Sequence, residues 1–397
     1  MRRKAEELEA LAAAYLYGQQ QTQEAIGRSL GLSQSVVSRL LSRASREGYL
    51  ETTTRFMVER VGEEEMKRVR ARVRPARLQE MLSNLSLKAS KQAGPTVHVY
   101  PSTSRNTSEA AWRHRLDEFG AACAMDLLGV LRTASVIGVS WGDTVASAIA
   151  AMKKIAPGVR GAQSHPRTII PLVGEPLGLN IKRSSSELAA RLDEALNAES
   201  EAGESRTLSL RPVPALIPAN MNEAETQAIR KLIGHITAYR EIFGRDGQDS
   251  GQAHESPPLI DRVDAVLTST STRERPLGFE DDSVIRAAGV PREKLNDLVV
   301  GDFCGALIPR PRLDEKALAE VDSIVQRWTG VTIEQLRECV VRAQRKNAPG
   351  ILVVAIGASK APVVHAAVRS GLVQHLFTDQ DLADRLEQIC AGARTAS

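Results

Sequence analysis

The sequence has no long hydrophobic run. No stretch approaches the ~18 uninterrupted apolar residues that a membrane-spanning helix needs. The start, "MRRKAEELEALAAAYLYG", is charged and amphipathic, without the apolar core and cleavage site of a signal peptide. Of the 397 residues, 42% are hydrophobic and 25% are charged, which is typical of a globular protein with two or three domains. We therefore expect a cytoplasmic protein without a membrane partner.

Cysteine is also scarce. The chain has four cysteines, which are far apart, form no CxxC pair and have no histidine at metal-ligand spacing: Cys123, Cys304, Cys339 and Cys390. This pattern argues against a disulfide framework and against a zinc site, and it predicts four small core residues in a reducing compartment. We expect no metal and no cofactor. The sequence has no internal repeat.

Positive charge is concentrated at the start of the chain. Residues 1–77 contain 15 Lys and Arg against 10 Asp and Glu, an excess of five, whereas the whole chain carries +4 at pH 7. The remainder of the chain is therefore close to neutral. A basic segment confined to the first fifth of a chain indicates an anionic polymer as its partner.

Residues 1–60 have the pattern of a helix-turn-helix domain. After a first helix, Thr22 is placed to cap the short helix "QEAIGRSL", and Gly31 can take the left-handed conformation that ends it. Ser33 then precedes a second helix, "QSVVSRLLSRASREG", over residues 34–48. A strand over "YLETTTRF" is expected to close the domain. Two short helices around a tight glycine turn are typical of this DNA-binding motif.

The second of these helices separates its apolar and polar residues. Its valines and leucines recur on one face, which leaves Gln, Ser and Arg on the other. Because Gln and Arg can form paired hydrogen bonds to base edges in the major groove, we expect double-stranded DNA as a partner. The alternative is a small helical subdomain with a solvated polar face. Expected base contacts are Gln34, Ser35, Ser38 and Arg39, and expected phosphate contacts are Arg28, Arg43 and Arg46.

Residues 61–93 are charged and then amphipathic, and they are expected to form a helix, a break at Pro75 and a second helix. By composition they are a linker. Alternatively, Met66, Val69 and Val73 lie on one helical face and form a seam against a second subunit, and we favour this interpretation.

From residue 94 to 397 short apolar strands alternate with helices, which predicts an α/β fold with a doubly wound, mostly parallel sheet. The expected strands include "TVHVY", "SVIGVS", "TIIPLVG", "VDAVLTST", "ILVVAIGA" and "QHLFT". Residues 197–258 are polar and rich in Gly, Ser and Pro, and we expect mobile loops there on both sides of one helix, "NEAETQAIRKLIGHITAYREIF".

Three small polar loops follow expected strands: "GVSWGDT" (138–144), "STSTR" (269–273) and "IGASK" (356–360). Ligands of such sheets bind beyond the carboxyl ends of the strands. One anion could be held by the backbone amides after Gly142, the Thr144 hydroxyl and the Lys360 ammonium. The alternatives are that Gly142 only forms a turn and that Lys360 is a solvated surface charge.

Several stretches occur in the order of a known family: "TQEAIGRSLGLSQSVVSRLLSRASREGYL", "VIGVSWGDTVASAI", "SSELAARLDEAL", "VDAVLTST" and "ILVVAIGASKAPVVHAAVRSGLVQHLFTDQDLADRL". In them the chain resembles the SorC/DeoR-type sugar-binding transcriptional regulators, and the closing run is the most specific. The resemblance implies a sugar-phosphate-isomerase-like effector domain at residues 94–397. It also implies a homo-oligomer, a dimer or a tetramer, whose binding to operator DNA is controlled by a phosphorylated sugar.

The resemblance also assigns residues. It places residues 142–144 in the ligand loop, makes Lys360 the lysine that reaches the phosphate, and puts Thr378 and Asp379 near the pocket. Departures from the family pattern, such as "TSTSTR" after "VDAVL" and the long polar insertion, leave the identity of the effector open. The expected effector contacts are Ser140, Trp141, Gly142, Asp143, Thr144, Ser269, Thr270, Lys360 and Asp379.

Two other classes of function compete with a regulator. An isomerase or deaminase acting on sugar phosphates would use a carboxylate as general base, with Asp143, Asp302 and Asp379 as candidates. The carboxylates and histidines show no recognisable catalytic spacing, and an isomerase needs no DNA-binding domain, so we expect no enzymatic activity. A scaffold that only oligomerises would bind no small molecule.

Overall fold

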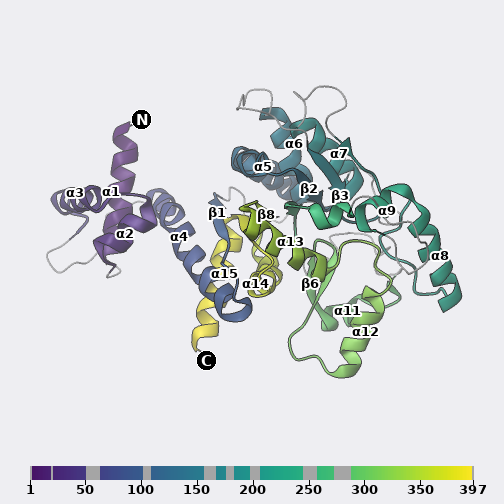
Figure 1. The fold of residues 1–397 in the computed structure, drawn as a ribbon. Coiled ribbons are helices and arrows are strands. Elements are labelled where there is room, and N and C mark those ends of the chain that lie inside the picture. Colours follow the sequence, from purple (N-terminus) through teal and green to yellow (C-terminus); the bar gives the residue numbers. More distant parts are fainter. Residues whose placement is uncertain are drawn as a thin grey trace.

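The computed structural model describes residues 2–18, 21–50, 63–101, 109–155, 167–175, 183–196, 206–244, 257–271 and 288–395. These residues form an N-terminal helical unit, a long connecting helix and a larger α/β body (Figure 1). None of the helices in these ranges combines the length and the hydrophobicity that crossing a membrane requires.

The N-terminal unit contains three helices packed around a small apolar core: α1 (Arg2–Gly18), α2 (Gln23–Leu30) and α3 (Gln34–Arg46). The predicted caps of α2 are present. The Thr22 hydroxyl accepts a hydrogen bond from the amide of Ala25 at 3.2 Å, and Gly31 has a left-handed φ of 66°. Ser33 occupies the cap position of α3, but its hydroxyl bonds to that of Ser35 instead of a backbone amide. Most of the expected strand after α3 lies outside the described residues.

The connecting helix α4 (Glu63–Ser90) is continuous, so the expected break at Pro75 is wrong. A proline removes one backbone hydrogen bond and crowds the preceding turn. Packing on the C-terminal side of the proline opposes this cost, because Leu78 and Leu82 are fully buried against the body. The side chains of the expected seam at Met66, Val69 and Val73 lie outside the described part of the chain.

The body is built on a seven-stranded sheet in which every neighbouring pair is parallel. This confirms the predicted fold class. In spatial order the strands are β1 (Thr96–Tyr100), β9 (His375–Asp379), β8 (Gly350–Ala355), β5 (Ala265–Thr268), β2 (Val136–Val139), β3 (Thr168–Pro171) and β4 (Arg206–Thr207).

Helices cover both faces of this sheet. Alternate strand residues such as Ile137 and Leu267 pack on one face against α5 (Glu109–Leu131), α6 (Asp143–Ile155) and α7 (Ser185–Leu196). Their neighbours Val136 and Val266 pack on the other face against α4, α13 (Ile333–Lys346), α14 (Ala361–Arg369) and α15 (Gln380–Thr395). The continuously apolar strands follow from burial on both sides.

Two regions differ from the sequence-based expectation. The helix expected near residues 222–243 is two helices, α8 (Glu223–His235) and α9 (Thr237–Phe243), separated by extended backbone at Ile236. The expected loops beside it lie largely outside the described residues. A separate antiparallel pair, β6 (Val299–Phe303) and β7 (Ala306–Pro309), packs with α11 (Arg292–Leu298) and α12 (Glu315–Val325) and was not predicted.

The close approach of α5 to α6 depends on a glycine. A Cβ on Gly120 would lie 2.7 Å from the backbone oxygen of Ser147, whereas a Cβ on Gly129 of the same helix would meet nothing within 4 Å. We expect Gly120→Ala to destabilise the protein by about 1–3 kcal/mol through overpacking. Gly129→Ala, the matched control, should stabilise it by about 0.5–1 kcal/mol. Urea unfolding measures both, and equal stabilities of the two variants would contradict the close contact.

Candidate functional site

The candidate site lies where the winding direction of the sheet reverses. From β2 the chain continues to β3 and β4 on one side, and it then returns to place β5 on the other side of β2. The loops after β2, β5 and β8 therefore lie side by side at the carboxyl ends of three adjacent strands. Ligands of open α/β sheets bind at such a reversal point.

The Lys360 ammonium joins these three loops. Lys360 ends a short 3-10 helix, η6 (Ala358–Lys360), after β8. Its Nζ donates to the Thr144 hydroxyl at 3.3 Å, at the start of α6, and to the Ser269 hydroxyl at 3.0 Å, after β5. The residues predicted to hold one anion are thus in contact. Lys360 is not the solvated surface charge of the alternative interpretation.

The surroundings of Lys360 are unusual for a lysine. Desolvation lowers its pKa to about 8, against the opposing influence of the carboxylates of Asp143, Asp302 and Asp379. Within the described residues this ammonium forms hydrogen bonds to two hydroxyls and no ion pair, so it retains charge that an incoming anion can neutralise. This arrangement fits an anion site.

The loop after β2 is held in place from both ends. Gly142 has a φ of 127°, which L-residues with side chains rarely adopt, so a turn here needs glycine whatever else the loop does. Asp143, the first residue of α6, forms an ion pair with Arg183 at 2.8 Å. The hydroxyls of Ser140 and Thr268 lie 2.7 Å apart in the core, and the buried ring of Trp141 meets that of Trp328 edge to face.

Thr270 contributes a buried hydroxyl. It lies in the loop after β5 and its backbone forms a bridge with Phe303. Among the described residues, its Oγ1 has no hydrogen-bond partner. A buried hydroxyl without a partner costs about 1–3 kcal/mol, which a ligand oxygen at this edge of the sheet would recover.

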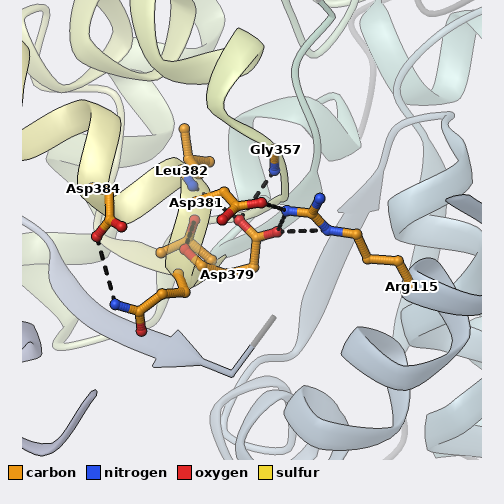
Figure 2. A network of polar contacts seen from close by, with 8 residues as sticks. Arg115, Gly357, Asp379, Asp381, Leu382 and Asp384 are labelled. Carbon is orange, nitrogen blue, oxygen red and sulfur yellow. Dashed lines mark hydrogen bonds and ion pairs between the residues drawn. The ribbon is translucent and has the colours of Figure 1, made fainter. Parts of the chain in front are cut away.

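Asp379, at the end of β9, is occupied by protein groups (Figure 2). Its Oδ1 accepts hydrogen bonds from the amides of Gly357 and Leu382, both at 3.0 Å. Its Oδ2 accepts from the Arg115 guanidinium, whose Nη2 also reaches Asp381 at 2.6 Å. Asp379 therefore anchors the loop that leads to Lys360, and its predicted contact with an effector stays a prediction.

Arg115 is a residue that the sequence-based prediction missed. It lies in the first part of α5, where Arg113 precedes it by two positions, and nothing in the local pattern distinguishes the two arginines. Only the fold shows that Arg115 reaches β9. The sequence contains many arginines, and none of its patterns indicates which arginine pairs with a predicted pocket carboxylate.

The general-base candidates are also engaged. Asp143 pairs with Arg183, Asp379 pairs with Arg115, and Asp302 accepts a hydrogen bond from the amide of Gly305 at 3.1 Å. All three carboxylates therefore already have partners within the protein. Across the described residues, no three His, Cys, Asp or Glu side chains are grouped to hold a metal, and the four cysteines are buried thiols.

The polar face of α3 is open to solvent. All four predicted base contacts are exposed: Gln34, Ser35, Ser38 and Arg39. Of the predicted phosphate contacts, Arg46 is exposed, Arg28 forms an exposed ion pair with Glu24, and Arg43 is paired with Glu47 at 2.6 Å and with Glu6. The hydrogen bond to Glu47 raises the pKa of Arg43. Part of the charge of Arg43 is therefore already compensated within the protein.

No protein-family model matches the sequence, and no curated protein matches it. Solved structures match its fold. A domain of a possible sugar-binding transcriptional regulator from Arthrobacter aurescens TC1 has a TM-score of 0.49 at 18% identity, covering 79% of this chain and 97% of that chain. The probable sor operon regulator from Shigella flexneri has a TM-score of 0.48 at 17% identity, covering 77% and 98%.

One match extends over almost the whole chain. The full-length sorbitol operon regulator SorC from Klebsiella pneumoniae has a TM-score of 0.52 at 19% identity, covering 96% of this chain and 99% of that chain. The matched region therefore takes in residues of the N-terminal unit, the connecting helix and the α/β body of this chain. The chain shares the fold of the Klebsiella sorbitol operon regulator.

Proposed function

We propose that this protein is a transcriptional regulator that binds operator DNA under the control of a small anionic effector, a phosphorylated sugar or a derivative of one. One observation carries the proposal: the desolvated ammonium of Lys360 is held by hydroxyls from two other loops at the reversal point of the sheet. The fold shared with a sorbitol operon regulator and the exposed polar face of α3 support it.

Each part of the chain has a role in this proposal. Residues 1–60 bind DNA, residues 61–93 connect and pair subunits, and residues 94–397 bind the effector and assemble a homo-oligomer. The effector phosphate bridges the Lys360 ammonium and the backbone amides at the start of α6, where the helix dipole favours negative charge. It controls DNA binding only if one arrangement of the oligomer holds it more tightly than the other.

An enzyme on the same fold is the weaker alternative. Isomerisation or deamination of a sugar phosphate requires a carboxylate free to accept a proton. Asp143 and Asp379 are each held by an arginine, which favours a sensor over an enzyme.

Two variants that remove the hydrogen bond between Lys360 and Thr144 test the effector site. Thr144→Val keeps the shape of a buried side chain and removes its hydroxyl, and Lys360→Met removes the ammonium. Operator duplexes are selected from a random-sequence library, and DNA affinity is measured with and without inorganic phosphate, glucose 6-phosphate and fructose 6-phosphate. We expect both variants to lose the response and to keep DNA affinity within about twofold when no phosphate compound is present, because the change is confined to the pocket.

Lys346→Met, on the exposed end of α13, is the matched control and should respond as the wild type does. A normal response from either pocket variant would place the effector site elsewhere. Failure of the wild type to bind any of a broad panel of phosphorylated and free sugars would favour a scaffold.

Effector affinity should depend on pH in one direction. Because the pKa of Lys360 is lowered to about 8, the ammonium loses its proton as the pH rises through that value. The second pKa of a phosphate ester is near ~6, so the ligand charge is constant over the same range. Calorimetry between about pH 7 and pH 9 should show affinity falling as pH rises, by up to about tenfold per unit above the lysine pKa. Lys360→Arg keeps its charge throughout, and a similar fall in this variant would contradict the assignment.

We expect Arg39 and Arg46 of α3 to have different roles in DNA binding. Arg39→Ala is expected to cost about 1–3 kcal/mol on the selected operator and to relax the base preference, because Arg39 is placed to contact base edges. Arg46→Ala should weaken binding to specific and random duplexes alike and reduce the salt dependence, because a phosphate contact is independent of sequence. Fluorescence anisotropy measures both, and equal losses on specific and random DNA for Arg39→Ala would refute its role.

A further inference from the structure

The loop that carries Lys360 is fixed by a buried carboxylate at its start. Lys360 follows Gly357 by three residues, and the Gly357 amide donates to Asp379. The same carboxylate oxygen accepts the amide of Leu382 in the first turn of α15 (Figure 2). One side chain therefore sets the distance between the loop after β8 and the start of α15.

Asp379 requires a cation. Its side chain is 1% exposed, and an ionised carboxylate at such burial is costly unless it is paired and hydrogen-bonded. The Arg115 guanidinium, 12% exposed, supplies the charge through Nε at 3.0 Å and through Nη2. Asp381, 29% exposed, shares Nη2 and lies nearer to solvent. Figure 2 shows the guanidinium in contact with the carboxylates of both Asp379 and Asp381.

The turn at Gly357 lies near the same part of α5. Gly357 has a φ of 89°, and a Cβ placed on it would lie 3.8 Å from the ring of Trp112, an ordinary van der Waals distance. The Arg115 guanidinium carbon lies 5.9 Å from the centre of that ring. Trp112 and Arg115 are three positions apart and therefore on the same face of α5. The turn at Gly357 is thus held by Asp379 and lies near Trp112.

We propose that Arg115 is a positioning residue of the anion site: through Asp379 it fixes the turn at Gly357 and so places the Lys360 ammonium between the hydroxyls of Thr144 and Ser269. The inference rests on the proposed function in taking this lysine as the anion ligand. Arg115 acts without contacting the anion, because its bonds are made to Asp379 and Asp381. Loss of Arg115 would leave a buried carboxylate without its cation, so that the carboxylate leaves its place and the loop loses its anchor.

Two measurements test this role, one of them without any ligand. The titration of Lys360 is followed by NMR of ¹³C-labelled lysine in the ligand-free protein, with its signal assigned from Lys360→Arg. The affinity for inorganic phosphate is measured by calorimetry. In Arg115→Met, we expect the Lys360 titration to move from about 8 towards the ordinary lysine value of 10.5, because the released loop exposes the ammonium to water. We expect phosphate affinity to fall about tenfold or more.

The matched control is Arg113→Met, because Arg113 lies on the same helix and is exposed. It should leave both measurements as in the wild type. Arg115→Lys keeps the charge but loses the fork that contacts Asp379 through two nitrogens, so it should give intermediate values in both. If Arg115→Met does not fold, Arg115→Lys decides by the same two measurements.

Two outcomes would overturn the role of Arg115. The first is an unchanged Lys360 titration in Arg115→Met, or in Arg115→Lys where only that variant folds; weaker phosphate binding together with that result would make Arg115 a direct ligand. The second is the same shift in Arg113→Met. Failure of the proposed function would give a different result. The wild type would then bind no phosphate, or Lys360→Met would bind it as tightly as the wild type. The titration of Lys360 in the ligand-free protein would still test the role of Arg115.

Discussion

A parallel sheet requires each strand to be followed by a connection that brings the chain back to the same starting edge. In this protein that requirement places the carboxyl ends of the sheet strands at one edge, and helices cover both faces. Residues as far apart in sequence as Thr144 and Lys360 meet for this reason alone. The polar groups of the site thus lie at the edge of the sheet where the backbone amides at helix starts also point. Such an edge suits a bound anion better than it suits apolar packing.

The site combines a desolvated cation with carboxylates that are already compensated. Arg183 pairs with Asp143 and Arg115 pairs with Asp379, whereas within the described part of the chain the hydrogen bonds of the Lys360 ammonium go to hydroxyls. Two of the three carboxylates that influence Lys360 are thus held in ion pairs, and the third, Asp302, accepts a hydrogen bond from the Gly305 amide. This distribution distinguishes the site from a simple network of surface salt bridges, in which each charge has its own partner.

The features predicted correctly from sequence are those set by local rules or by the strand pattern. The caps at Thr22 and Gly31 follow from backbone chemistry, and the convergence of the loops after β2, β5 and β8 follows from the parallel sheet. Predictions failed where long-range packing decides. Burial of Leu78 and Leu82 keeps α4 intact beyond Pro75, and Arg115 differs from Arg113 only in what α5 faces after folding. Asp379 was predicted as an effector contact, which stays a prediction, and the groups that hold it were not predicted, because Arg115 and Gly357 are distant from it in the sequence.

The unbroken connecting helix has a mechanical consequence. At a rise of about 1.5 Å per residue, the 28 residues of α4 extend roughly 42 Å. One end packs against β1, α14 and α15 of the body, and the helix also contacts α1 and α2 (Figure 1). A stiff rod of this length converts a small angle into a large displacement: a tilt of about 5° at the body moves the far end by about 3.7 Å, close to the rise of about 3.4 Å between successive base pairs. A rearrangement too slight to disturb the core of the body is therefore large on the scale at which DNA sequence is read.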